Sequence, residues 1–202
     1  GHPLSERINE ILAKAAQEEN VLLGVGSQRI ALKDPSTRRS FEIVRELAPS
    51  IPILGNLGIG QVSSSEFNLD DVSECIEMIG ADAMAIHFNA LHELVQEGGD
   101  VSFKLFGENF ARLRKRFDLP IIAKEVGCGF NSEVTRTLDS MGFDGFDVGG
   151  LGGTSFAKIE LERAQQGASR EGVSRMLADV FRDWGLPTPV SIKHARSITD
   201  KM

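Results

Sequence analysis

The chain has 202 residues, 41% of them hydrophobic, which is enough for one core, so we expect a single domain over residues 1–202. With 22 Lys and Arg residues against 29 Asp and Glu residues, the net charge is -7, which argues against a nucleic-acid partner because a phosphate backbone needs a basic face. An anionic small molecule is still allowed, since a local group of cations can reverse the field within one cleft.

The sequence contains no run of 18 apolar residues and no signal-peptide pattern, so we expect a cytoplasmic protein that does not insert into a membrane. Cys75 and Cys128 lie far apart and lack the spacing of paired metal ligands. They are therefore expected to be free thiols in a reducing compartment rather than a metal–thiolate site.

Five short runs rich in Val, Ile, Leu and Ala have the length of buried strands. They occupy residues 21–26, 52–58, 83–88, 120–127 and 145–150. Their apolar stretches are nearly continuous, which is typical of strands covered on both faces in a parallel sheet. The first three start at residues 21, 52 and 83, a constant step of 31. This step fits one strand plus one crossover helix, repeated.

Segments of helical period lie between these runs. They occupy residues 6–20, 41–48, 70–80, 108–117 and 132–142, and a further helix is expected over 188–202. In the first segment Ile8, Ile11, Leu12 and Ala15 fall on one stripe, which predicts an amphipathic helix with that stripe against the core. Glycine or proline ends most of these segments.

Repeated βα units leave two architectures, an open doubly wound sheet or a closed (β/α)8 TIM barrel. Polar residues help to choose, because they stand at or just past the C-terminal end of every expected strand. These residues are Ser27, Gln28, Arg29, Asn56, His87, Asn89, Lys124, Glu125 and Asp147. In a barrel all those ends share one mouth, whereas an open sheet needs contributions only near its switch point. The pattern therefore favours the barrel.

The predicted barrel is incomplete, because about five of the eight strands are visible. The first strand and the last two are missing, and such a sheet would expose raw edges. We therefore expect the 202 residues to be a portion of a longer chain.

Three segments carry candidate ligand contacts, each with an ordinary alternative. Residues 24–29 offer two glycines for close backbone approach and then three hydrogen-bond donors, but a plain βα loop with a surface arginine has the same spacing. Residues 147–154 are glycine-rich, as in anion-binding loops and in flexible connections alike. Lys124 needs a partner near the mouth, either a neighbouring carboxylate or an anionic ligand.

Residues 85–96, AIHFNALHELVQ, crowd two histidines, an asparagine and a carboxylate after an apolar run. The four polar groups are His87, Asn89, His92 and Glu93. One carboxylate is a poor metal site alone, but it suits a Mg²⁺ ion that also takes substrate phosphate oxygens and water. A solvated polar loop is the alternative.

Taken together, these segments resemble the type 2 isopentenyl diphosphate isomerase family of FMN-dependent barrel enzymes. The resemblance runs through VGSQR, GNLG, ADAMAIHFNALHELVQEGGD, PIIAKEVGCG, GFDGFDVGGLGGTSFAKIE and FRDWGLPTPVSI, in the family's order and approximate spacing. It implies interconversion of isopentenyl and dimethylallyl diphosphate by an allylic proton shift. The flavin must be reduced, with NAD(P)H as a possible reductant, and a homo-oligomer is implied.

The resemblance also assigns roles to residues. It places the flavin contacts at Ser27, Asn56, Lys124 and Thr154. It places the diphosphate substrate at Ser27, Gln28, Arg29, His87, Asn89 and His92. Lys124 would face the flavin's N1/O2 side, where its charge stabilises the anionic reduced form. Glu93 would be the Mg²⁺ ligand, and His92 and Lys124 the residues closest to the chemistry.

The chain departs from the family pattern at His92, where a glutamine is expected. Histidine exchanges protons near neutral pH and glutamine does not. His92 therefore replaces an orienting hydrogen bond, adds an acid/base group, or marks a weakened enzyme, and the first reading is preferred because a neutral imidazole still donates one hydrogen bond. Glu97-Gly98 also replaces the family's usual Pro-Glu.

Two other functions stay open at this point. An FMN-dependent oxidoreductase on a related barrel would use the same lysine, with Cys128 as a conceivable nucleophile. A portion of a barrel that only binds ligand, or is inactive, is the non-enzymatic alternative.

Overall fold

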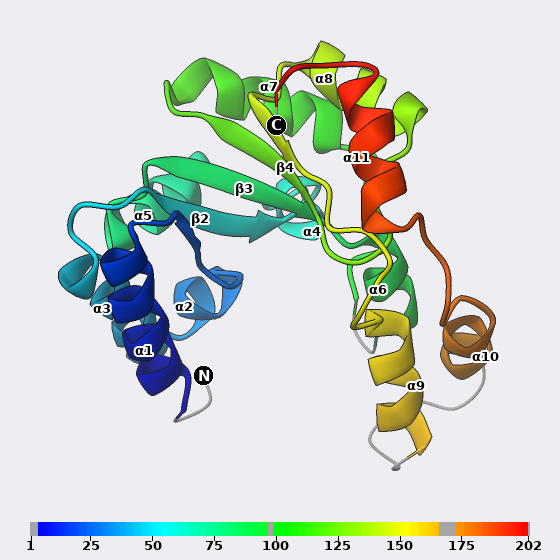
Figure 1. Ribbon diagram of the computed structural model, residues 1–202, viewed down its shortest axis with the longest axis horizontal. Coiled ribbons are helices and arrows are strands. Elements are labelled where there is room, and N and C mark those ends of the chain that lie inside the picture. Colours follow the sequence, from blue (N-terminus) through cyan, green and yellow to red (C-terminus); the bar gives the residue numbers. More distant parts are fainter. Residues whose placement is uncertain (1–3, 97–98, 166–172, 202) are drawn as a thin grey trace.

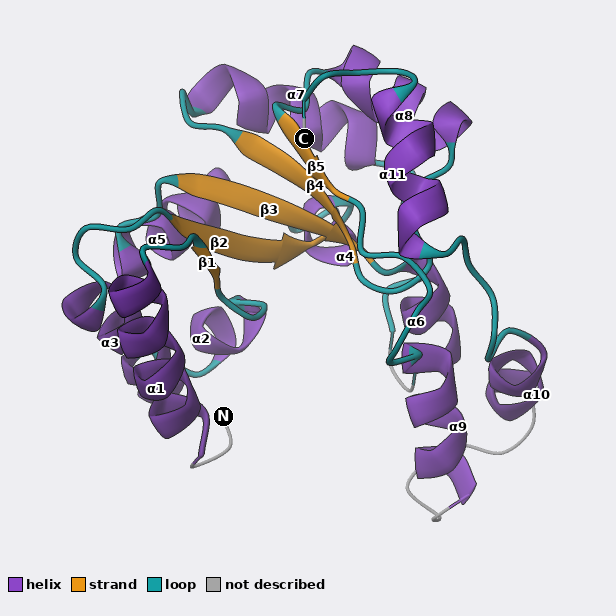
Figure 2. Ribbon diagram, viewed as in Figure 1, coloured by secondary structure: helices purple, strands orange, loops and turns teal. Residues whose placement is uncertain are grey.

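The computed structural model describes residues 4–96, 99–165 and 173–201 and contains one parallel five-stranded sheet. The strands are β1 (Leu23–Gly24), β2 (Ile53–Gly58), β3 (Ala83–Phe88), β4 (Ile121–Glu125) and β5 (Gly145–Asp147). Each falls within an apolar run expected to be a strand, so the five strand predictions are confirmed. The strands pair in sequence order, β1-β2-β3-β4-β5, and Figure 2 shows that the sheet is curled.

Helices connect the strands, as the repeated βα pattern predicted (Figure 1). The longer ones are α1 (Leu4–Glu19), α3 (Arg39–Leu47), α5 (Leu69–Ile79), α7 (Phe106–Arg116), α8 (Ser132–Met141) and α11 (Thr188–Arg196). Several ends have local causes. Asn131 caps α8 by accepting a hydrogen bond from the Val134 N–H, and α5 ends at Gly80 with a φ of 53°, a conformation that favours glycine.

Six further elements were not predicted. They are α2 (Arg29–Lys33), a 3₁₀ turn (Pro35–Thr37), α4 (Ile59–Val62), α6 (Ala90–Val95), α9 (Phe156–Gln165) and α10 (Val173–Val180). Three of them lie just past the C-terminal ends of strands: α2 follows β1, α4 follows β2, and α6 follows β3. Residues expected to form polar loops there are therefore held on short helices.

The main core lies on the convex face of the sheet, under α5, α7 and α8. Ile86, Ala123 and Phe146 from three adjacent strands are at most 5% exposed and belong to this core. Phe110 and Phe143 stack within it at a centroid separation of 4.3 Å. Burial of this kind stabilises the fold by roughly 25 cal/mol for each Å² of apolar surface removed from water.

The helix α1 was predicted correctly, but the prediction of which of its faces is buried was wrong. Ile8, Ile11 and Leu12 are each about half exposed, whereas Ala13 and Ala16 are buried. The helix packs against α3, and its two alanines face the second core cluster. Because small side chains let the two helices approach closely, the larger residues of α1 turn outward. Among the described residues, none of the helices combines the length and apolarity that crossing a bilayer requires.

Candidate functional site

The strand register brings His87, Lys124 and Asp147 into one row across the concave face of the sheet. His87 pairs with Lys124, and Lys124 pairs with Asp147. Directly paired residues of parallel strands point to the same side, so the three side chains are neighbours. Lys124 Nζ donates a hydrogen bond to Asp147 Oδ2 at 2.6 Å, and both side chains are about a third or more exposed. Such an exposed ion pair adds about 1 kcal/mol or less to stability. Because the pair is weak, Lys124 can leave Asp147 to contact an anionic ligand.

His87 is held by a hydrogen bond that fixes its tautomer. Asn56 Nδ2 donates to the Val25 carbonyl at 3.0 Å, so Asn56 Oδ1 is the atom that faces His87 Nδ1 at 2.7 Å. An amide oxygen only accepts, so Nδ1 carries the proton. In the neutral ring the other nitrogen, Nε2, then has a free lone pair.

The pKa of His87 is lowered to about 4, mainly by burial; the charge of Glu93 opposes this shift, and Lys124 and His92 contribute to it. Charged imidazole loses its hydration when it is buried, which favours the neutral form. At neutral pH His87 therefore contributes no positive charge. An anion beside Nε2 would favour proton uptake, because it would stabilise the imidazolium.

A polar pocket of about 320 Å³ gathers seven of the residues that the sequence singled out. They are Ser27, Arg29, Asn56, His87, Asn89, His92 and Glu93. Ser27 and Arg29 follow β1, Asn56 lies in β2, His87 lies in β3, and the other three follow β3, so polar groups from separate βα repeats share one pocket, as the sequence predicted. Arg29 lies 3.4 Å from Asp100 Oδ2 and is 34% exposed, so its guanidinium can turn toward an anion in the pocket.

Gln28 takes a different position from the one predicted. Its side chain is fully buried, with Oε1 accepting from the Asn56 N–H at 3.1 Å and Nε2 donating to the Cys75 carbonyl at 2.8 Å. It does not line the polar pocket. The predicted substrate contact is therefore not supported by this arrangement, because the amide holds the Asn56 backbone in place.

Lys124 lies in an adjoining pocket of about 230 Å³, the lysine pocket, which also contains Asp147, Gly24 and Gly55. Asn56 lines both this pocket and the polar pocket. Of the predicted flavin contacts, Asn56 and Lys124 line the lysine pocket, whereas Ser27 lines the polar pocket.

Thr154 is exposed and lines none of the pockets described here. The glycines of its loop have packing reasons. A Cβ on Gly149 would come within 2.4 Å of the Glu125 carbonyl oxygen, and one on Gly150 within 2.6 Å of the Leu186 carbonyl oxygen. Gly149 and Gly150 thus serve close backbone approach, a reason that neither interpretation of the sequence included, whereas a Cβ on Gly153 would meet no atom within 4 Å.

Glu93 does not fit a Mg²⁺ ligand as it is placed. It is 4% exposed, and both oxygens already accept hydrogen bonds: Oε1 from Asn89 Nδ2, and Oε2 from Gln96 Nε2 and the Asp100 N–H. Within residues 4–96, 99–165 and 173–201, no group of three or more His, Cys, Asp and Glu residues could hold a metal ion.

His92 has a partner that the sequence did not reveal. Its ring stacks on Phe156 at 4.8 Å, and its Nε2 lies 3.3 Å from Glu160 Oε1. Glu160 is 7% exposed and comes from α9, 68 residues further along the chain. The helical spacing of Phe156 and Glu160, one turn apart, was the only local signal for this face.

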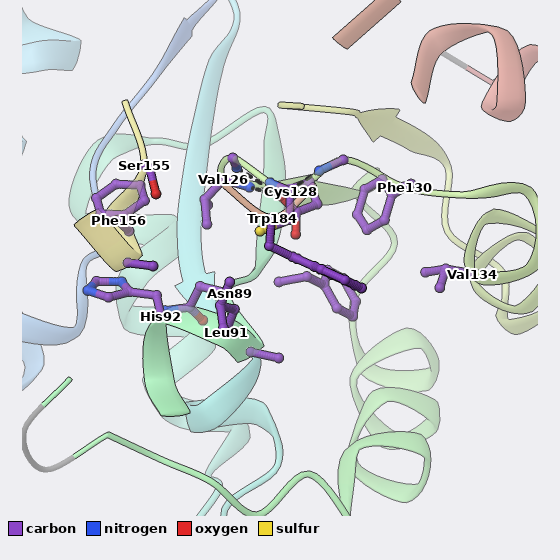
Figure 3. Close-up of a pocket in the computed structure, with 16 residues that line it drawn as sticks. Asn89, Leu91, His92, Val126, Cys128, Phe130, Val134, Ser155, Phe156 and Trp184 are labelled. Carbon is purple, nitrogen blue, oxygen red and sulfur yellow. Dashed lines mark hydrogen bonds between the residues drawn. The ribbon is translucent and has the colours of Figure 1, made fainter. Parts of the chain in front are cut away.

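An apolar pocket of about 300 Å³ lies on the other side of His92 (Figure 3). Its polar groups are largely satisfied. Glu125 Oε2 accepts the backbone N–H groups of residues 126–129, and burial nevertheless raises the pKa of this carboxyl. Burial also raises the pKa of the Cys128 thiol to about 11, which favours the protonated and less nucleophilic form of Cys128 at neutral pH.

The chain has close relatives among archaeal proteins named isopentenyl-diphosphate delta-isomerase. It is 43% identical over 203 residues to the protein of Thermococcus kodakarensis, covering 99% of this chain and 53% of that protein. The protein of Pyrobaculum islandicum is 44% identical over 98% of this chain and 55% of that protein, and the protein of Methanosarcina acetivorans is 41% identical over 97% and 53%. The chain therefore spans about half the length of these relatives.

No protein-family model matches the chain. Among solved structures, the radical S-adenosylmethionine methyltransferase TsrM of Kitasatospora setae matches with a TM-score of 0.40 and 12% identity, over 80% of this chain and 34% of that one. A likeness at this level bears on neither fold nor function.

Proposed function

Because this chain is a homologue, over nearly its whole length, of archaeal isopentenyl-diphosphate delta-isomerases, we propose that it belongs to a type 2 enzyme that interconverts isopentenyl and dimethylallyl diphosphate with reduced FMN. The observation that carries the proposal is the polar pocket, in which side chains from three successive βα repeats converge. Such convergence suits one small anionic ligand.

The strand order supports a partial (β/α)8 barrel for the same protein. Five parallel strands follow one another without a reversal of order. A doubly wound sheet places its ligand where the order reverses, whereas a barrel collects its loops at one mouth. The curl of the sheet and the shared polar pocket agree with the barrel.

The diphosphate would lie in the polar pocket. Arg29 is the cation there, and a guanidinium suits two phosphate oxygens at once. The Ser27 hydroxyl can donate a further hydrogen bond, and His87 can donate from Nε2 once it takes up a proton. Asn89 Oδ1 is buried without a hydrogen-bond partner among the described residues, and as an acceptor it suits a donor such as a water beside the diphosphate rather than a phosphate oxygen.

The lysine pocket fits the flavin's anionic side. Lys124 supplies a positive charge that is 31% exposed, held in place by Asp147 at 2.6 Å. When bound, reduced FMN would supply electron density beside the alkene. Lys124 would stabilise the negative charge of the reduced ring, and Asn56 would separate flavin from diphosphate. NAD(P)H as reductant and assembly into a homo-oligomer belong to the same proposal.

His92 lines both the polar pocket and the apolar pocket, so it would orient a substrate that lies across the two. Its stacking on Phe156 and its contact with Glu160 hold the ring in one plane. Because a carboxylate only accepts, the contact with Glu160 takes the single N–H of a neutral ring at Nε2, and Nδ1 is left as an acceptor toward the substrate, which corrects the donor role expected from the sequence. If His92 only orients, His92→Gln will leave turnover and its pH profile unchanged.

The test follows isopentenyl diphosphate together with prereduced FMN under anaerobic conditions. We expect dimethylallyl diphosphate to accumulate while the flavin stays reduced. Net flavin oxidation that matches product formation would contradict the isomerase and point to an oxidoreductase.

Arg29→Gln should weaken diphosphate binding about 10- to 100-fold, because a charge-assisted hydrogen bond contributes about 1.5–3 kcal/mol. Arg39→Gln is the matched control, since Arg39 pairs with Glu46 and does not line the polar pocket. Equal effects of the two substitutions would place the anion elsewhere.

A further inference from the structure

The apolar pocket is an elongated space that begins at His92. Figure 3 shows Phe156 and His92 at one end and Phe130 and Val134 at the other, with Trp184 across the front. Aromatic and aliphatic side chains therefore form most of its lining. Its carboxylate, Glu125, already accepts four backbone N–H groups, so the pocket offers little to a second charged group.

This pocket adjoins the polar pocket directly. Asn89, His92, Val126 and Phe156 line both. A ligand with an anionic head and a hydrocarbon tail could thus place its head beside Arg29 and its tail past Val126. A ligand that is polar throughout would use only the first pocket.

The size of the apolar pocket exceeds what a five-carbon chain needs. A cavity of about 150 Å³ holds benzene, which has six carbons. At about 300 Å³ the apolar pocket has roughly twice that volume. A ten-carbon chain matches it, whereas the five-carbon tail of the proposed substrate would leave most of it empty.

We propose that the chain binds prenyl diphosphates longer than five carbons, with the diphosphate in the polar pocket and the hydrocarbon in the apolar pocket. The inference rests on the proposed function for the position of the diphosphate. It adds a ligand class that would compete with the five-carbon substrate for Arg29 and His87.

Trp184, the only tryptophan of the chain, makes the tail site directly observable. We would titrate the protein with inorganic diphosphate, dimethylallyl diphosphate and geranyl diphosphate by calorimetry and by tryptophan fluorescence. Each fully buried methylene strengthens binding up to about fourfold, and partial burial of five more carbons should give at least about tenfold tighter binding of geranyl diphosphate. Only geranyl diphosphate should shift the Trp184 emission.

Val134→Asp tests the far end of the pocket. Val134 is 40% exposed and is the third residue of α8, where a negative charge is compatible with the helix N-terminus. We expect about tenfold weaker binding of geranyl diphosphate and unchanged binding of dimethylallyl diphosphate. Val190→Asp is the matched control, because Val190 is 39% exposed, is the third residue of α11 and does not line the pocket.

The outcomes separate this inference from the proposed function. If inorganic and dimethylallyl diphosphate fail to bind, the diphosphate site is wrong and the inference falls with it. If both bind but geranyl diphosphate binds no more tightly, or Val134→Asp and Val190→Asp act alike, the tail site is overturned while the proposed function stands.

Discussion

The two faces of strands β3, β4 and β5 have different roles. On the convex face one register row is apolar and at most 5% exposed, and it consists of Ile86, Ala123 and Phe146. One residue further along each strand, the row on the concave face is polar, and it consists of His87, Lys124 and Asp147. Because side chains alternate along a strand, neighbouring residues of one strand serve different purposes. The residues of the convex row stabilise the core, and those of the concave row are available to a ligand.

The largest expected effect on stability comes from a substitution in the apolar row of the convex face. Phe146→Ala should lower the free energy of unfolding by about 3–5 kcal/mol, because it leaves a cavity beside Phe130. Urea denaturation measures the change. The neighbouring Asp147→Ala is the matched comparison and should cost about 1 kcal/mol or less, since its ion pair is exposed. Similar losses at the two positions would contradict the division between the faces.

Acid should destabilise the protein through the concave row. The folded pKa of His87, about 4, lies below its ordinary 6.5, so the unfolded chain binds the proton first as pH falls. Stability from this group is complete above pH 6.5 and falls toward pH 4, by up to about 3 kcal/mol. Urea denaturation at several pH values measures it.

His87→Gln is the control for that pH dependence. Glu125, whose pKa is raised, acts in the opposite direction because the folded state holds its proton more tightly. The difference between the parent protein and His87→Gln isolates the histidine. Parallel curves for the two proteins would show that His87 is not the cause.

Asn56→Ala should cost about 1–3 kcal/mol, because it leaves the Val25 carbonyl and the His87 Nδ1–H without their partner. Asn56→Asp tests the same contact in another way, because a carboxylate at this distance should raise the pKa of His87 by about 1–3. NMR titration of the His87 ring measures that pKa. An unchanged value would show that the two side chains do not touch.

The smallest effect on stability is expected at Lys124. Lys124→Gln removes one exposed ion pair, so the free energy of unfolding should change by about 1 kcal/mol or less. Affinity for reduced FMN should nevertheless fall, because the positive charge is lost. Lys158→Gln, which removes the exposed pair with Asp183, is the control. Equal FMN affinity in both variants would place the flavin away from the lysine pocket.

The sequence predicted the strands because each is a short apolar run with clear ends. It predicted the meeting of polar residues because parallel strands bring their C-terminal ends together. It could not show which way a side chain turns after the strand ends. Gln28 turns inward to the Cys75 carbonyl, 47 residues away. Glu93 lies on α6, where its oxygens meet Asn89, Gln96 and the Asp100 backbone.

Contacts between distant segments also could not be predicted from the sequence. Glu160 meets His92 across 68 residues, and no local pattern linked them. The stripe on α1 was visible, but packing against α3 selected the alanine face instead. Periodicity thus predicts that a helix has two faces, whereas the neighbouring elements decide which face is buried.

The most direct test maps the binding of dimethylallyl diphosphate by NMR on the isotopically labelled protein. We expect perturbed amides to cluster at residues 27–29, 56, 87–89 and 92–93, which frame the polar pocket. Perturbations confined to other parts of the chain, or spread evenly over the surface, would contradict this expectation.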